Sequence, residues 1–110
     1  MAYDPELADR LREILQDEPG LTEQRMFGGL GFMLDGNMAV AASSGGGILL
    51  RIDPARSGEL ADGVRARRFE MRGRAMDGWL DVDPAAAETE EALREWVAHG
   101  VVHARSLPPK

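Results

Sequence analysis

Apolar residues near the start of the chain recur every three or four positions, which predicts one face of an α-helix. These residues are Leu7, Leu11, Ile14 and Leu15. Asp4-Pro5 supplies a capping side chain followed by a proline that suits the first helical turn, and Pro19-Gly20 stops the segment. We therefore expect a helix that begins at Pro5 and ends before Pro19.

Beyond this helix the apolar spacing shortens towards two residues, the period of a β-strand. Asp35-Gly36 stands between two apolar runs within Gln24–Ser43, and such a dipeptide is a strong signal for a tight hairpin turn. After the glycine-rich stretch Ser43–Gly47, the segment Ile48–Asp53 alternates again. The pattern predicts two strands around the hairpin and a third strand after the glycines.

The second half of the chain repeats these signals. Asp53-Pro54 predicts a short helix through Leu60 to about Asp62. Residues 68–72 and 79–82 alternate and are joined by a link that contains Gly and Asp, which indicates a second hairpin. A last helix is expected to begin near Thr89. Its apolar stripe comprises Leu93, Trp96, Val97, Gly100, Val101 and Ala104.

The predicted order of elements is α-β-β-β-α-β-β-α, within a single domain that spans residues 1–110. Hairpins imply antiparallel pairing, and three amphipathic helices need a sheet to pack against. We therefore expect a two-layer α+β fold, with an antiparallel sheet of about five strands packed by helices.

The glycines Gly28, Gly29 and Gly31 raise the question of nucleotide binding. A phosphate-binding loop places its glycines between a strand and a helix, whereas apolar residues and a tight turn follow them here. We interpret the segment as a hairpin strand in which the glycines permit a bulge or close approach of another backbone. The two faces of this strand would carry Met26, Leu30, Phe32 and Leu34 on one side and Phe27, Gly29, Gly31 and Met33 on the other.

The second face of this hairpin keeps apolar side chains that need a cover. They are Phe27, Met33, Met38 and Val40. Either a helix of the same chain or a second copy in a homodimer would supply that cover. Trp79 is the aromatic residue best suited to recognition, although packing under a helix explains it equally well.

Charge and composition narrow the classes of function. The net charge of −6 argues against nucleic-acid binding through the overall field of the protein, and the only lysine is Lys110. The absence of cysteine excludes disulfides and thiolate sites, and it fits a reducing compartment. Neither a targeting segment nor an apolar run of membrane-spanning length is present. We expect a cytoplasmic protein that does not associate with membranes.

A local cluster of arginines could still contact nucleic acid. With Glu70 it carries a net charge of 5 − 1 = +4, and its members are Arg65, Arg67, Arg68, Arg72 and Arg74. The alternative, which we favour, is a solvated strand face whose charges are neutralised across the hairpin by Asp77, Asp81 and Asp83.

His99 and His103 lie one helical turn apart, with Glu95 one turn earlier, so the three are weak candidates for a metal site. The zincin pattern would require Glu where Gly100 stands, and we favour boundary residues beside the apolar stripe. The sequence offers no recognisable catalytic constellation and no cofactor motif, so we expect neither an enzyme nor a cofactor.

Several motifs in order resemble the amino-terminal domain of the TfoX/Sxy family, bacterial regulators of natural competence. The motifs are Met26–Phe32 followed by Asp35–Met38, then Arg51–Pro54, Phe69–Trp79, Trp96-Val97 and Ala104–Lys110. The resemblance implies a two-layer α+β domain with an antiparallel sheet that often pairs into dimers, and it carries over no established catalytic residue. The longer regulators have an additional carboxy-terminal domain, and this chain resembles only the amino-terminal one.

Together these observations predict a small, non-catalytic regulatory module that acts through protein contacts. The expected surface is the open sheet face together with the hairpin loop between Arg72 and Trp79, and its residues are Phe27, Met33, Met38, Val40 and Trp79. The alternative is a nucleic-acid-binding protein that uses the arginine cluster, and a metal-binding protein or enzyme is less favoured.

Overall fold

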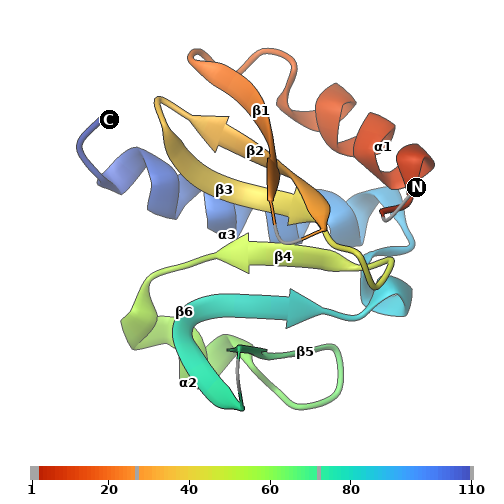
Figure 1. Cartoon of the computed structure of the whole chain (residues 1–110), viewed down its shortest axis with the longest axis vertical. Coiled ribbons are helices and arrows are strands. Elements are labelled where there is room, and N and C mark those ends of the chain that lie inside the picture. The colour runs from red at the N-terminus through yellow and green to blue at the C-terminus, as the bar shows by residue number, and fades with distance from the viewer. Residues whose placement is uncertain (1–2, 27, 72, 110) are drawn as a thin grey trace.

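The chain forms one six-stranded sheet with its helices on one face of that sheet (Figure 1). The computed structural model describes residues 3–26, 28–71 and 73–109. Its helices are α1 (Pro5–Leu15), α2 (Ser57–Leu60) and α3 (Glu90–Ser106). Its strands are β1 (Leu21–Met26), β2 (Gly29–Leu34), β3 (Asn37–Ala42), β4 (Ile48–Arg51), β5 (Ala66–Met71) and β6 (Arg74–Val82).

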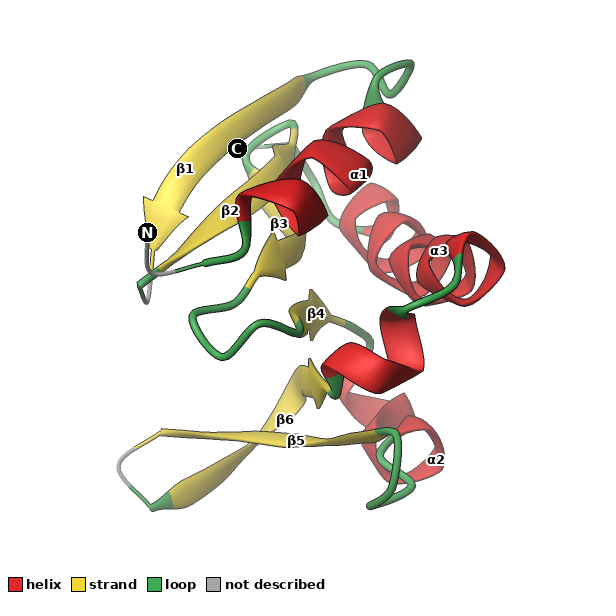
Figure 2. Cartoon of the chain, turned by 90° about the vertical axis from the view of Figure 1, so that its right-hand side faces the viewer, coloured by secondary structure: helices red, strands yellow, loops and turns green. Residues whose placement is uncertain are grey.

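The strand order is β1-β2-β3-β4-β6-β5, and every neighbouring pair is antiparallel. Figure 2 shows all three helices on one side of the sheet, while the opposite face is left uncovered by helices. The predicted α+β class is confirmed, with six strands in place of about five. Within the described residues, none of the helices combines the length and the apolar character needed to cross a membrane.

Two helical segments begin where the Asp-Pro pairs predict. The Asp4 carboxylate accepts a hydrogen bond from the backbone N–H of Glu6 (3.0 Å), and that of Asp53 accepts one from Ala55 (2.9 Å). Asp53 precedes a short 3₁₀ turn (Pro54–Arg56) that leads into α2. Thr89 caps α3 by accepting from Ala92 N–H at 3.1 Å, as expected for a side chain that satisfies a free backbone donor.

The additional strand arises because the predicted strand before Asp35 is broken into β1 and β2. Met26 pairs with Gly29, so the chain reverses between them, and Gly28 has a φ of +76° that a β-branched or bulky residue rarely adopts. A Cβ on Gly29 would collide with the carbonyl oxygen of Ala42 in β3. The expected close approach of another backbone is therefore confirmed, but the expected single strand was wrong.

The break in the strand also moves Met26 to the other side of the sheet. Instead of sharing a face with Leu30 and Phe32, Met26 joins the cluster on the open face. Its sulfur occupies the space beside Gly31, where an added Cβ would lie only 2.9 Å from it. Gly31 thus leaves room for a methionine from the neighbouring strand.

The predicted turn at Asp35-Gly36 is present. Both residues have positive φ, 51° and 85°, which is the requirement of a type I′ hairpin turn, and Leu34 pairs with Asn37 across it.

A bulge in β3 changes which face its side chains occupy. Phe32 pairs with Val40 and Met33 with Met38, so Ala39 is an extra residue between two paired positions. Met38 consequently lies on the open face, whereas Val40 lies on the helix-covered face with no exposed surface. The prediction that Val40 shares the open surface with Met38 was wrong, because the bulge breaks the strict alternation on which it depended.

The main core lies between the sheet and the helices. Its largest fully buried side chains include Phe32, Leu11, Leu15, Ile48, Leu50, Leu80 and Leu93. Helix α3 approaches the bulge of β3 so closely that a Cβ on Gly100 would collide with the Ala39 carbonyl oxygen. The glycine in the predicted apolar stripe therefore marks a close contact between the helix and the sheet.

A second irregularity shapes the β5–β6 hairpin. Arg68 pairs with Leu80 and Phe69 with Met76, which leaves Asp77, Gly78 and Trp79 outside this pairing. Residues 74–78, which we expected in a loop, therefore belong to strand β6, and Arg72 lies outside the described residues. The prediction of a hairpin loop from Arg72 to Trp79 was wrong, because most of this segment is strand.

Contacts with the segment after β4 hold this irregular part of β6 in place. Gly78, whose φ is +87°, donates its N–H to the buried Ser57 hydroxyl at 2.7 Å. Its carbonyl accepts a hydrogen bond from Ile52 N–H at 2.8 Å. The arrangement directs Trp79 to the open face, where it pairs with Arg51 of β4.

Candidate interaction groove

The open sheet face carries a second, smaller apolar cluster. Its centre is buried and consists of Met38, Ala41 and Leu49, from β3 and β4. Partly buried side chains surround this centre, namely Met26 and Met33 from the β1–β2 hairpin and Phe69 and Trp79 from the β5–β6 hairpin. Because helices cover only the other face (Figure 2), this cluster is shielded by side chains of the sheet itself and by the end of the chain.

A groove of about 610 Å³ runs along this face at the end of the sheet where β3 begins and β4 ends. Its apolar walls include Met26, Met33, Met38 and Trp79, and residues 107–109 after α3 form a further wall. The buried Asn37 donates its side-chain N–H to the carbonyl oxygen of Pro108 at 2.9 Å, which fixes that wall against β3. Such a volume with a mainly apolar lining is typical of ligand-binding clefts.

Of the described residues that line this groove, Arg51 is the charged one. It is half-buried, and its guanidinium carbon lies 4.7 Å from the centre of the Trp79 ring, a cation–π contact. Among the described residues, no carboxylate lies within ion-pair distance of Arg51. The groove therefore combines an apolar lining with a positive charge.

The sequence predicts part of this surface. The structure brings Met33, Met38 and Trp79 together on the open face, excludes Val40, and leaves Phe27 outside the described residues. The overlooked residues include Met26, Leu49, Arg51 and Phe69. The alternation of β4 carries a usable signal, because Ile48 and Leu50 on the core face imply that Leu49 and Arg51 point the other way.

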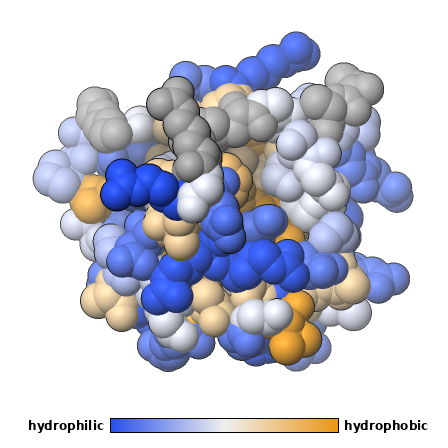
Figure 3. Space-filling model, turned by 60° about the horizontal axis from the view of Figure 1, so that its bottom comes forward, coloured by the Kyte–Doolittle hydropathy of each residue, from blue (hydrophilic) through white to orange (hydrophobic). Residues whose placement is uncertain are grey.

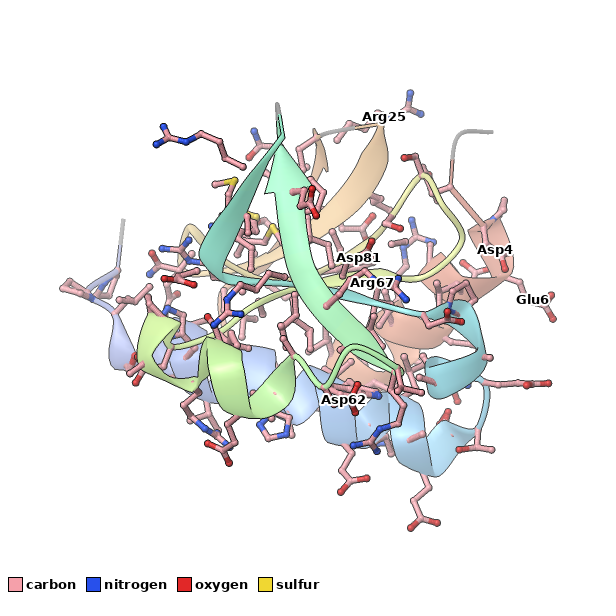
Figure 4. All side chains as sticks on the ribbon, turned by 90° about the horizontal axis from the view of Figure 1, so that it is seen from below. Asp4, Glu6, Arg25, Asp62, Arg67 and Asp81 are labelled. Atoms are coloured by element: carbon pink, nitrogen blue, oxygen red, sulfur yellow. The ribbon has the colours of Figure 1, made fainter. Side chains whose placement is uncertain are left out.

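The arginine cluster does not form one surface. Arg65 pairs with Asp62 at 2.9 Å and lies over the Trp96 ring of α3, on the helix side. Arg68 pairs with Asp77 at 2.9 Å, also close to α2, whereas Arg67 lies opposite Asp81 on the open face (Figure 4). Arg72 lies outside the described residues. Neutralisation by Asp77 across the hairpin is confirmed.

The side of the molecule that carries α2, β5 and β6 is covered mostly by hydrophilic side chains (Figure 3). On this side of the molecule, Asp62 accepts hydrogen bonds from the backbone N–H groups of Val64, Arg65 and Ala66. Together with a further bond from the Arg65 side chain, they strongly lower the pKa of the Asp62 carboxyl. Asp81 behaves in the opposite way. Burial raises its pKa, an effect that Arg67 opposes and Asp83 reinforces.

The two histidines are half-buried at the edge of the α3 stripe. His99 Nδ1 lies 3.4 Å from the Arg56 guanidinium, and the His99 ring is 6.2 Å from that of Trp96. Burial lowers the pKa of His103, the positive charge of Arg51 lowers it further, and Asp53 partly opposes them. Glu95 and His103 line different cavities, and within the described part of the chain no three His, Asp or Glu side chains are grouped as metal ligands.

The fold is a two-layer α+β domain with one face of its sheet left open. The family described as TfoX N-terminal domain matches residues 13–104, which is most of the chain. The protein therefore belongs to the TfoX N-terminal domain family, and the predicted resemblance is confirmed. A comparison with curated proteins gives no significant match.

Proposed function

We propose that this protein is a non-catalytic regulatory module that binds another protein through its open sheet face. The observation that carries the proposal is the groove of about 610 Å³, lined by Met26, Met33, Met38 and Trp79 on a face without helices. Flexible methionine side chains adapt to the shape of a partner, and aromatic residues anchor many interfaces. Membership of a family named for TfoX supports a regulatory role.

We further propose that the protein acts in the cytoplasm and that its partner is a different protein. The absence of cysteine suits a reducing compartment. Nucleic acid is a weaker alternative, because Arg65 and Arg68 already pair with carboxylates and lie on a different side from Arg67. A second copy of the chain on the open face is the other alternative.

The test is affinity capture with the full chain as bait, in lysate of the organism that carries the gene, with and without nuclease. Three baits are compared, namely wild type, Met33→Glu in the groove and Val102→Glu on the exposed side of α3, where Val102 is 69% exposed. Circular dichroism first establishes that each bait is folded. A charge at position 33 should abolish contact with an apolar partner surface, while the same charge at position 102 should be harmless.

The proposal predicts a defined protein that is captured by wild type and by Val102→Glu, lost with Met33→Glu, and unaffected by nuclease. Loss of all captured material on nuclease treatment would favour the nucleic-acid alternative. Capture that is equal for all three folded baits would contradict a role for the open face. Concentration-dependent dimers that disappear with Met33→Glu in sedimentation analysis would instead favour self-association.

A further inference from the structure

Among the residues that the structure describes, no carboxylate pairs with the positive charge in the groove, whereas several other arginines form ion pairs. Ion pairs of 2.7–3.3 Å involve Arg12, Arg56, Arg65, Arg68, Arg94 and Arg105. Arg51 is half-buried between Trp79 and the apolar walls, and no described carboxylate reaches it. A partly desolvated cation gains more from an added carboxylate than an exposed one, because water screens the attraction less.

The surroundings of Arg51 define what a ligand must bring. The guanidinium carbon lies over the Trp79 ring, 4.7 Å from its centre. A guanidinium on an aromatic face still has N–H groups with which it can bind a carboxylate. Next to it, Met33 and Met38 offer apolar surface that favours an aliphatic or aromatic group. A ligand complementary to both parts carries an acidic group beside apolar groups.

The wall of the groove indicates the form of that ligand. Residues 107–109, which include two prolines, line the groove, and the backbone of Leu107 is extended. Asn37 hydrogen-bonds this segment through the carbonyl of Pro108. Figure 1 shows this segment beyond α3, beside the end of β2 and the start of β3. One wall of the groove is therefore irregular backbone held beside a strand, and an extended peptide can lie along such a wall, as in peptide-recognition grooves.

We propose that the groove binds an extended peptide segment of the partner protein in which an Asp or Glu side chain lies beside apolar residues. The carboxylate pairs with Arg51, and the apolar side chains fill the space between Trp79 and the two methionines. This inference rests on the proposed function, because it names the kind of segment that the open face recognises.

The experiment selects peptides from a random twelve-residue display library on the immobilised full chain, and it then measures binding of one enriched peptide by fluorescence polarisation. The variants are Arg51→Gln, which removes the charge, and Arg94→Gln, a matched control on the exposed side of α3. The peptide is also made with its acidic residue changed to the amide. Thermal unfolding of each variant establishes that it is folded.

We expect enriched sequences to contain Asp or Glu beside apolar residues. Arg51→Gln should weaken binding by about ten-fold or more, whereas Arg94→Gln should leave it unchanged. The amide peptide should bind wild type as weakly as the acidic peptide binds Arg51→Gln, and the two changes together should add little, because they remove the same contact.

Enriched peptides without acidic residues, or undiminished binding to folded Arg51→Gln, would overturn this inference. The proposed function would survive that result if Met33→Glu still abolished binding of the same peptides and capture of the partner. A selection that enriches no peptide would likewise overturn the inference of a linear segment, whereas failure of the proposed function shows as partner capture that Met33→Glu does not change.

Discussion

The close contact between α3 and the bulge of β3 makes Gly100→Ala an informative substitution. In an exposed helix, replacing Gly by Ala stabilises a protein by about 0.5–1 kcal/mol, because Gly loses more backbone entropy on folding. At position 100 the added Cβ would collide with the Ala39 carbonyl oxygen and lie 2.9 Å from the Ala39 carbonyl carbon. The sign of the effect should therefore be reversed.

The size of the stability loss depends on which atoms must move to make room for the added Cβ. Overpacking a tight core costs about 1–3 kcal/mol. We take the upper half of that range, because the obstacle is the backbone of a central strand and not the end of a flexible side chain such as Leu50. After the propensity gain is subtracted, the expected net loss of unfolding free energy is about 1–2.5 kcal/mol, and the melting temperature should fall by about 4–8 °C per kcal/mol.

The assay is chemical and thermal unfolding followed by circular dichroism, with Ala98→Gly as the control. Ala98 is exposed on the same helix, so its replacement should cost about 1 kcal/mol through helix propensity alone. An unchanged or raised stability of Gly100→Ala would refute the close packing of α3 on β3. It would also undermine the bulge at Ala39 that places Met38 and Val40 on opposite faces.

Three further predictions concern single side chains. Val40→Ala should lower the unfolding free energy by about 2 kcal/mol in urea titration, because Val40 is fully buried in the main core; an unchanged value would contradict that placement. The raised pKa of Asp81 means that its ionisation costs stability as pH rises through the folded pKa, so Asp81→Asn should stabilise the protein at pH 7 and make no difference in strong acid. The lowered pKa of His103 means that stability falls as pH drops below about 6.5 towards the folded pKa. His103→Gln should flatten this dependence in urea titrations between pH 7.5 and 5, and an identical slope in both proteins would contradict the burial of the ring.

The sequence predicts best the turns and helix caps, whose geometry depends on residues adjacent in the chain. The Asp35-Gly36 turn needs two residues that tolerate positive φ, and the caps at Asp4 and Asp53 need a short acceptor before the first helical turn. These requirements are met by residues adjacent in the chain, so periodicity and turn composition suffice to find them.

The errors arise where distant segments decide the geometry. The bulge at Ala39 lies under Gly100 of α3, and the irregular pairing at Gly78 depends on Ser57 and Ile52. Both shift the alternation of side chains by contacts that no local pattern encodes. For the same reason the sequence predicts the wrong face for Val40.

The sequence alone predicts only part of the candidate site. Met33, Met38 and Trp79 could be placed on one face from hairpin periodicity. The role of Arg51 could not be predicted, because its contact with Trp79 and its distance from the described carboxylates depend on the pairing of β4 with β6. Its place in the groove also depends on the path of residues 107–109.

Methyl NMR of the full chain, labelled at methionine, isoleucine and valine, locates the binding surface directly during titration with the captured partner. If the partner binds the open sheet face, the signals of Met26, Met33 and Met38 should shift or broaden. The signals of Ile14, Val101 and Val102 should stay unchanged, because those residues line the groove between α1 and α3 on the other side of the sheet. Changes confined to the latter residues, with the three methionines unaffected, would contradict the claim that the open sheet face is the binding surface.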